Sequence, residues 1–318
     1  MANVIEPGLA VGHAGAAVGG ESVRKRRMSS ETMWGLLCVA PAVLGFVLFE
    51  FGPMVASFVL ALTDWSVSGQ THWLGFENFQ VIFQDDRLFR SAARVTLTYA
   101  AISVPLQIIV AFLLALLLNE RIRGLPIFRT IFYLPATVPL VASSVLWLWM
   151  FNPDFGLLNT ILGKVGLPEQ QWIYSSDTVL PSLILMSLWG VGPMMIIFLA
   201  GLTAIPQHLY EAVSLDGGNV FNRLWSVTIP MITPTLFFNL VLSVIGALQT
   251  FIQAYVITSG GPNNASLFYG LYLYNKAFQL GDLGYAAALG VIQFVVIAAL
   301  TVVIFSTSDR WVHYGGED

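Results

Sequence analysis

The sequence predicts an all-α, polytopic membrane protein. Composition gives the first indication, because hydrophobic residues make up 56% of the 318 residues and charged residues only 10%, whereas charged residues average about 25% of soluble proteins. The second is the length of the apolar runs. A membrane-spanning helix needs around 20 apolar residues, and runs of this length recur along the chain. The third is their spacing, which leaves no polar segment long enough to fold as a soluble domain.

Six apolar runs are predicted to cross the membrane. They are residues 33–62, 93–118, 131–151, 179–203, 230–258 and 283–306. With their loops they form one predicted membrane domain at 29–309, preceded by a disordered cytoplasmic tail at 1–28 and followed by a second cytoplasmic tail at 310–318. The first run far exceeds the 7–15 apolar residues of a signal peptide, so we expect an uncleaved first span.

Breaks are predicted inside several of these spans. Glu50-Phe51-Gly52-Pro53 interrupts the first one, and Glu50 is the only carboxylate within a predicted span. A hydrated kink or an ion pair with an external residue is favoured there over proton coupling. Pro135, Pro139 and Pro193 interrupt later spans. Such breaks are tolerated where neighbouring helices or a cavity satisfy the freed backbone groups. In the last span, Gly284 and Ala288 have the spacing of a helix-packing face.

The distribution of Lys and Arg predicts the orientation of the chain. With the N-terminus inside, nine of these residues fall in cytoplasmic segments: Arg24, Lys25, Arg26, Arg27, Arg121, Arg123, Arg129, Arg223 and Arg310. Five fall in external segments or at their boundary: Arg87, Arg90, Arg94, Lys164 and Lys276. Because cytoplasmic loops carry the excess of positive charge, we expect both termini in the cytoplasm.

The most polar internal segment lies between the fourth and fifth spans, at 204–229. Pro206 suits the first turn of a helix, and Gly217 suits a left-handed residue at its end. Asn219 can cap a second short helix, and Pro230 marks the start of the next span. The segment is therefore predicted to be a helix, a glycine elbow and a second helix, all outside the membrane.

This segment resembles the cytoplasmic loop of ABC-importer permeases. The family pattern is E-A-A, three residues, G, nine residues, I-x-L-P, and here Val213, Val227 and Ile229 replace three of its apolar positions. The resemblance implies a coupling helix that docks on a separate ATPase subunit. The residues so assigned are Glu211, Ala212, Val213, Leu215, Asp216, Gly217 and Gly218. An ordinary amphipathic loop between helices is the alternative.

Two further motifs resemble the carbohydrate class of these permeases. They are F-R-T-x-x-x-L-P at 128–135 and T-x-G-G-P at 258–262. The resemblance implies a type I importer fold with six spans in a bacterial or archaeal plasma (inner) membrane. It also implies several partners: a second homologous permease, an ATPase dimer, an extracytoplasmic solute-binding protein, a sugar substrate and membrane lipid, but no nucleic acid.

No cofactor is expected on this chain. The segment Gly156–Lys164 has some likeness to a phosphate-binding loop, but its spacing is wrong and Val165 stands where Ser or Thr must bind Mg²⁺. ATP and Mg²⁺ are therefore expected on the partner ATPase. A metal site is not expected either, since each His lacks a partner ligand in the sequence.

Polar side chains in the fifth predicted span indicate a candidate solute path. Ser243, Gln249, Thr250 and Gln253 fall in its outer half and share two helical stripes with small residues. Such a face suits a hydroxyl-rich solute, and hydrogen bonding between helices is an equally good explanation. The resemblance to maltose-type permeases implies a path along the third to fifth spans. It assigns Ala136, Leu140, Met186, Trp189, Gly190, Ser243, Gly246, Ala247 and Thr250, with Trp189 as a platform for a sugar ring.

We therefore predict the non-catalytic permease subunit of an ATP-driven, binding-protein-dependent sugar importer, coupled through Glu211–Pro230. The alternative is a secondary transporter driven by protons or sodium, which would need charged groups within the membrane beyond Glu50. A membrane enzyme would need a convergent catalytic set, and none is evident. The sequence does not identify the solute, although the lack of a central basic residue favours a neutral sugar over an anion.

Overall fold

The computed structural model describes residues 30–66, 69, 71–120 and 123–313. Every extended element within these ranges is a helix, apart from two isolated β-bridges. The predicted tail at 1–28 lies outside the described residues, as do residues 314–318 of the second tail. The chain divides into two compact units at Pro53, and each is described by itself.

The first unit contains α1 (Ser30–Phe46) and the π-helical turn η1 (Val47–Phe51). This turn coincides with the break predicted around Glu50, because a π-turn inserts an extra residue into the helical ladder. The side chain of Glu50 is exposed. Residues Met33–Leu60 are long and apolar enough to cross a membrane.

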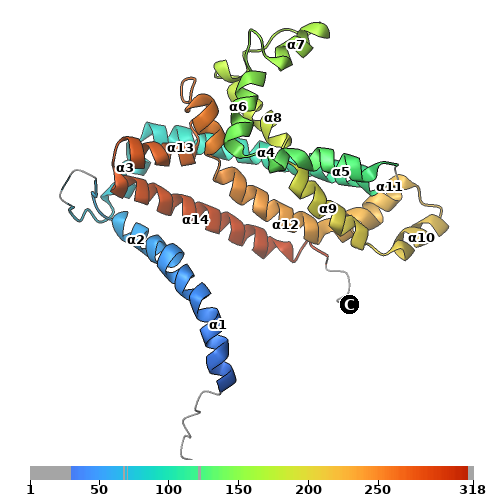
Figure 1. Cartoon of the computed structure of the whole chain (residues 1–318), viewed down its shortest axis with the longest axis horizontal. Helices are drawn as coiled ribbons and strands as arrows, with labels where there is room; N and C mark the ends of the chain where they lie inside the picture. Colours follow the sequence, from blue (N-terminus) through green and yellow to red (C-terminus); the bar gives the residue numbers. More distant parts are fainter. Residues whose placement is uncertain (1–29, 67–68, 70, 121–122, 314–318) are drawn as a thin grey trace, which may run out of the picture. The chain divides into compact units, whose positions relative to one another are not determined.

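The other helices belong to the second unit, except for the first two residues of α2, Gly52 and Pro53, which belong to the first unit. They are α2 (Gly52–Leu60), α3 (Glu77–Gln84), α4 (Arg87–Asn119), α5 (Leu125–Tyr133), η2 (Leu134–Thr137), α6 (Leu140–Met150), α7 (Leu157–Lys164), η3 (Trp172–Tyr174), α8 (Val179–Leu188), α9 (Gly192–Ala204), α10 (Gln207–Leu215), α11 (Val220–Arg223), η4 (Leu224–Thr228), α12 (Ile229–Leu248), η5 (Ala254–Thr258), α13 (Tyr269–Tyr274), η6 (Asn275–Gln279) and α14 (Leu283–Ser308). Within this unit, α10 and α11 lie at the end opposite to α3 and α13, and α6 and α7 project as an arm (Figure 1).

Helix α4 is the centre of the second unit, packing against α8, α9, α12 and α13. Its N-terminus is capped by Asp86, which accepts a hydrogen bond from the N–H of Phe89. Ala111 and Ala115 are one helical turn apart and fully buried with Met195 of α9. Small side chains at this spacing allow two helices to approach closely. The long apolar run of α4 therefore forms the scaffold on which the other helices are placed.

Asp86 also links α4, α13 and α14 by hydrogen bonds, at the end of the unit that carries α3 and α13. Its carboxylate accepts hydrogen bonds from the hydroxyls of Tyr272 and Tyr285, and the ammonium of Lys276 lies 4.5 Å from the centroid of the Tyr285 ring. Burial acts to raise the pKa of Asp86, but the hydrogen bonds outweigh it and leave that pKa below its usual value. A charged carboxylate with strong donors thus holds α4, α13 and α14 in register.

The apolar runs correspond to straight and bent helices. Four helices of the described chain are long and apolar enough to cross a membrane, and the number rises to six if each of two bent pairs counts as one span. The pair α5–η2 and α6 bends by 99°, and the pair α8 and α9 bends by 46°. Both bends contain prolines that the sequence analysis had noted as breaks: Pro135 and Pro139 in the first, Pro193 in the second.

Three predicted spans differ from the observed helices by several residues at their ends. Helix α4 begins at Arg87, earlier than the predicted start at residue 93. Helix α5 begins at Leu125, earlier than the predicted start at residue 131. The range 230–258 was placed too far along the chain, because the corresponding helix is Val220–Leu248. The observed helix begins in polar sequence, where the side chain of Asn222 is exposed. It stops within apolar sequence, before the break at Gln249.

Replacing Gly284 with Ala is expected to destabilise the protein. A Cβ atom on Gly284 would lie 2.1 Å from the carbonyl oxygen of Thr63 and 2.9 Å from the amide nitrogen of Trp65. The Gly284 N–H also donates to the Trp65 carbonyl at 2.8 Å. Overpacking of this kind costs about 1–3 kcal/mol, so the midpoint of thermal unfolding in detergent should fall. Gly290→Ala is the control, since its Cβ would meet Leu273 only at 3.8 Å; equal midpoints for the two variants would contradict the expectation.

Candidate functional site

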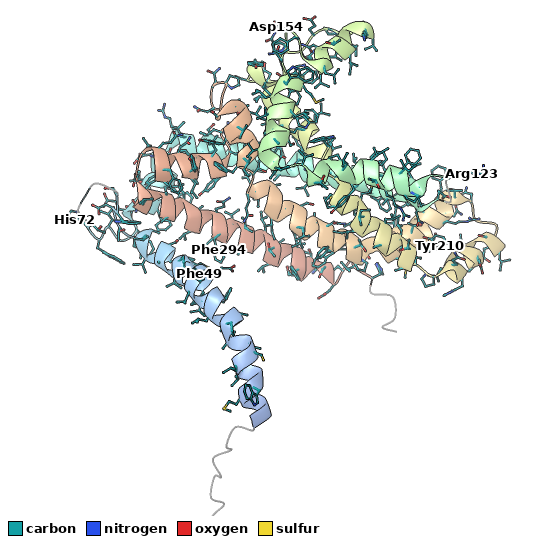
Figure 2. The ribbon with its side chains drawn as sticks, viewed as in Figure 1. Phe49, His72, Arg123, Asp154, Tyr210 and Phe294 are labelled. Atoms are coloured by element: carbon teal, nitrogen blue, oxygen red, sulfur yellow. The ribbon has the colours of Figure 1, made fainter. Side chains whose placement is uncertain are left out.

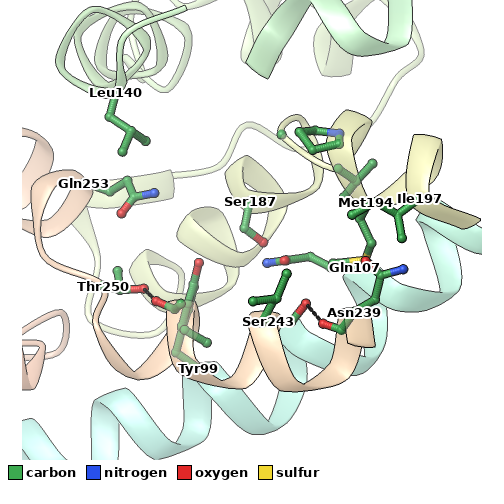
Figure 3. A pocket seen from close by; sticks show the side chains of 16 residues that line it. Tyr99, Gln107, Leu140, Ser187, Met194, Ile197, Asn239, Ser243, Thr250 and Gln253 are labelled. Carbon is green, nitrogen blue, oxygen red and sulfur yellow. Dashed lines mark hydrogen bonds between the residues drawn. The ribbon is translucent and has the colours of Figure 1, made fainter. Parts of the chain in front are cut away.

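A cavity of about 400 Å³ lies where α4, the bend between α8 and α9, and α12 meet, close to the start of α6. Side chains from these elements point into it (Figure 3). Its lining residues are Tyr99, Gln107, Leu140, Ser187, Gly190, Val191, Pro193, Met194, Ile197, Asn239, Leu242, Ser243, Gly246, Ala247, Thr250 and Gln253. None of them carries a charge. The surface is a mixture of neutral hydrogen-bonding groups and apolar side chains.

The bend between α8 and α9 opens this cavity. Helix α8 ends just before Gly190, and Pro193 cannot donate the backbone hydrogen bond that would continue it. Gly192 is held against the end of α5, because a Cβ atom there would lie 2.5 Å from the carbonyl oxygen of Phe132. The sequence Gly-Val-Gly-Pro thus bends the chain between α8 and α9, and Gly190, Val191 and Pro193 of the bend line the cavity.

Asn239 is the most unusual polar residue of the cavity. Its side chain is only 2% exposed, and its Nδ2 atom has no hydrogen-bond partner within the described part of the chain. The Ser243 hydroxyl donates a hydrogen bond to the backbone carbonyl oxygen of Asn239 at 2.7 Å, which a dashed line marks in Figure 3. A buried unsatisfied donor costs about 1–3 kcal/mol. Asn239 therefore places an uncompensated polar group in the wall of the cavity.

The structure brings seven of the eleven assigned path residues into this cavity. They are Leu140, Gly190, Ser243, Gly246, Ala247, Thr250 and Gln253. The other four lie elsewhere: Ala136 is exposed on η2, Met186 is buried in the core, and Gln249 lines a smaller pocket with Gln293. Trp189 does not line the cavity, and its indole packs edge-on against Trp147 with ring centroids 6.0 Å apart.

Several cavity residues were not anticipated from the sequence. Tyr99 and Gln107 come from α4, which corresponds to the second predicted span, whereas the resemblance directed attention to the third to fifth. Asn239 belongs to the inner half of the fifth predicted span, and the polar cluster noticed there was in the outer half. A polar residue in the middle of an apolar run was the available signal for both Gln107 and Asn239.

The coupling loop has the predicted helix and glycine elbow. Helix α10 follows Pro206 and ends before Gly217, whose φ of +78° is the left-handed conformation expected for that glycine. The N–H of Gly218 donates to the carbonyl of Val213 at 2.8 Å and closes the elbow. A Cβ atom on Gly218 would lie 2.5 Å from Cγ1 of Val213, so only glycine fits there.

The second helix of this loop differs from the prediction. Asn219 caps it as expected, accepting a hydrogen bond from the N–H of Asn222 at 3.0 Å. It is not a separate helix, however, because α11 continues through the π-helical turn η4 into α12. A π-turn absorbs the extra residue without ending the helix. The elbow therefore leads directly into one continuous helix, Val220–Leu248, that lines the cavity.

One face of the coupling loop is exposed. Glu211, Ala212 and Asp216 are exposed on it, and Leu215 is 89% exposed. Three further apolar residues, which the sequence analysis did not assign, are also exposed on α11 and η4: Val220, Phe221 and Trp225. Val213 faces the core instead. Apolar side chains gathered at one exposed loop are typical of a protein–protein contact.

Comparison with known proteins identifies the family. Residues 107–314 match the family model described as "Binding-protein-dependent transport system inner membrane component". The chain belongs to this family. The match includes most of the residues that line the cavity and the whole coupling loop.

The permease is also similar to individual proteins. It is 37% identical to the "Probable ABC transporter permease protein YesP" of Bacillus subtilis (strain 168), over 94% of this chain and 98% of that one. It is 33% identical to the "Trehalose/maltose transport system permease protein MalF" of Thermococcus litoralis, over 86% and 92% of the two chains. A solved bacterial alginate ABC transporter has the same fold, with a TM-score of 0.78 at 24% identity over 88% of this chain and 96% of that one.

These comparisons establish the fold and the role. The permease has the type I ABC-importer fold, and it is a multi-pass membrane subunit of a binding-protein-dependent importer. They favour this role over the ion-driven secondary transporter considered from the sequence. Membership implies a partner ATPase and a solute-binding protein. The first unit and Tyr99 precede the range matched by the family model.

Proposed function

We propose that this permease forms half of the translocation pathway of an ATP-driven importer of neutral sugars, with a second homologous permease supplying the other half. The observation that carries the proposal is the cavity, which offers amide and hydroxyl groups without any charged side chain. Sugars present many hydroxyls that both donate and accept hydrogen bonds, so a neutral lining of this kind suits them. The trehalose/maltose relative supports a carbohydrate substrate.

An anionic solute is the less favourable substrate for this cavity. An anion entering a site of low dielectric without a basic partner loses its hydration and gains little in return. One relative, the "sn-glycerol-3-phosphate transport system permease protein UgpA" of Agrobacterium fabrum, is named for an anionic solute. The lining residues of the present cavity include amides such as Gln107 and Gln253, but no Lys or Arg.

In the proposed mechanism, the solute-binding protein delivers sugar at the end of the permease opposite to the coupling loop. ATP and Mg²⁺ bind to the partner ATPase dimer, and nucleotide binding brings its two subunits together. The exposed face of α10 and α11, with Glu211 and Leu215, receives this motion, and α12 transmits it to the cavity. Glu211 is proposed to make a polar or ionic contact in the docking groove.

The proposed orientation places both termini in the cytoplasm, and the second unit supports the part of it that puts the coupling loop inside. Arg123 lies at the same end of the second unit as Tyr210 of the coupling loop, whereas His72 lies at the other end (Figure 2). Positive charge beside the coupling loop is what the positive-inside rule requires if that end is cytoplasmic. The permease is thus proposed to present its α10–α11 end to the cell interior of a bacterial or archaeal plasma membrane.

Purification from native membranes tests this proposal. A tagged permease is expected to bring down an ATPase and a second, homologous permease. The assembly in proteoliposomes should then accumulate labelled neutral sugars only when its binding protein and ATP are present. Neutral and anionic sugars are compared at equal concentration. Accumulation driven by a proton or sodium gradient without ATP would contradict the proposal, and preferred uptake of an anionic sugar would contradict its neutral-sugar part.

A further inference from the structure

A short chain of hydrogen bonds joins the coupling helix to the cavity-lining helix. The hydroxyl of Tyr210, on α10, lies 3.2 Å from Oγ1 of Thr228, the last residue of η4. Oγ1 of Thr228 in turn lies 3.3 Å from the carbonyl oxygen of Arg223. A threonine hydroxyl has one proton to donate. Thr228 therefore donates to Arg223, and Tyr210 donates to Thr228.

This contact occupies the protected side of the coupling loop. Thr228 is only 5% exposed and Val227 beside it is buried, while Tyr210 and Val213 pack against the same apolar cluster. The opposite side of α10 carries Leu215 and is exposed. A partner that pushes on the exposed side consequently moves Tyr210 against the base of the helix Val220–Leu248.

The contact is also the direct side-chain link between α10 and the helix that lines the cavity. Within the described part of the chain, Tyr210–Thr228 is the one side-chain hydrogen bond between α10 and the helix Val220–Leu248. From Thr228, α12 runs on to the cavity residues Asn239 and Ser243. The eleven residues from Thr228 to Asn239 span roughly 16 Å at 1.5 Å per residue. A displacement at Thr228 thus reaches the cavity wall through one helix.

We propose that Tyr210 and Thr228 form the positioning pair that transmits the motion of the coupling helix to the cavity. The inference rests on the proposed ATP-driven transport and adds to it a specific joint, located at the π-helical turn η4 that leads into α12. The pair touches neither solute nor nucleotide. Its role is to keep α10 and the base of α12 moving together, so that the motion of the ATPase changes the access of the cavity.

The test compares transport with ATP hydrolysis in the complete complex, in proteoliposomes that contain both permeases, the ATPase and the binding protein. Tyr210→Phe and Thr228→Val each remove the hydrogen bond with little change of shape. Each is expected to lower the amount of sugar taken up per ATP hydrolysed by roughly three- to tenfold, the factor that corresponds to one hydrogen bond. The double variant is expected to be no worse than either single one.

Two further variants make the result specific. Thr228→Ser keeps the hydroxyl and is expected to restore the wild-type ratio. Ser214→Ala removes a hydroxyl that bonds only within α10, to the carbonyl of Tyr210, and should leave the ratio unchanged. The complex is checked for assembly by size-exclusion chromatography. A wild-type ratio in both Tyr210→Phe and Thr228→Val overturns the pair, as does a loss of assembly in either.

Failure of the pair can be told apart from failure of the proposed function. If the wild-type complex shows no uptake that depends on ATP, the proposed function is wrong. If the wild-type complex is coupled and the two variants behave like it, the importer stands and only the role of Tyr210 and Thr228 is lost. The wild-type measurement therefore precedes the comparison of variants.

Discussion

Replacing Gly246 with Trp is expected to abolish sugar uptake while the complex still assembles. Gly246 lines the cavity on α12, and no atom lies within 4 Å of the position that its Cβ would occupy. The Cβ of a new side chain therefore meets no neighbour, and an indole attached there is expected to extend into the cavity and occupy the space that a sugar needs. Uptake in proteoliposomes should fall to the background, a loss of at least about 100-fold, because a filled path cannot be rescued by higher substrate concentration.

Two variants control for side effects of this substitution. Gly246→Ala adds only a methyl group in the same open space and is expected to transport nearly as well as the wild type. Phe238→Trp places the same indole on the same helix, at a side chain that is 51% exposed and does not line the cavity. Normal uptake by Gly246→Trp would show that sugar does not pass through this cavity, and the proposed pathway would be wrong.

Adding a side chain at the glycine elbow is expected to uncouple ATP hydrolysis from uptake. In Gly218→Ala, the new Cβ would lie 2.5 Å from Cγ1 and 2.7 Å from the carbonyl oxygen of Val213. The clash opens the hydrogen bond that closes the elbow and tilts α10 against its docking partner. Uptake should fall by roughly tenfold or more while the ATPase continues to hydrolyse ATP, since the strain of about 1–3 kcal/mol is concentrated in the coupling element.

Gly217 provides the matched comparison for this prediction, because its constraint is conformational rather than steric. Its φ of +78° disfavours a β-branched residue, yet the space around it is open. Gly217→Val is therefore also expected to uncouple, whereas Gly217→Asn should remain close to the wild type because Asn tolerates left-handed backbone. Measuring sugar uptake and phosphate release in the same vesicles tests all three variants. Tight coupling in both Gly218→Ala and Gly217→Val would contradict a mechanical role for the elbow.

Local features of the fold were predictable because they depend on neighbouring residues alone. The left-handed Gly217 and the cap at Asn219 follow from short-range sterics and hydrogen bonding, and both are confirmed. The break around Glu50 and the bends at prolines such as Pro193 have the same local origin. Where the local rules were weak, as at the ends of α12, the predicted boundaries differ from the observed ones.

The candidate site was predictable only in part. Ser243, Ala247 and Thr250 lie in the cavity as the helical stripe indicated, because residues three and four apart share one face. Gln107 and Asn239 were missed, and Trp189 was assigned to the path although its ring packs on Trp147. A stripe identifies the residues that share a face of one helix. It does not say which other helix lies opposite that face.

The sequence by itself determined the membrane class, the number of apolar runs and the elbow of the coupling loop, since apolar length and backbone sterics are properties of short segments. Only the tertiary structure decided that α4 supplies Tyr99 and Gln107 to the cavity, and that α11 is the first turn of the cavity-lining helix. Those facts depend on which helices pack together and in which rotation. Such packing is set by contacts between residues far apart in the chain, which periodicity along one segment does not encode.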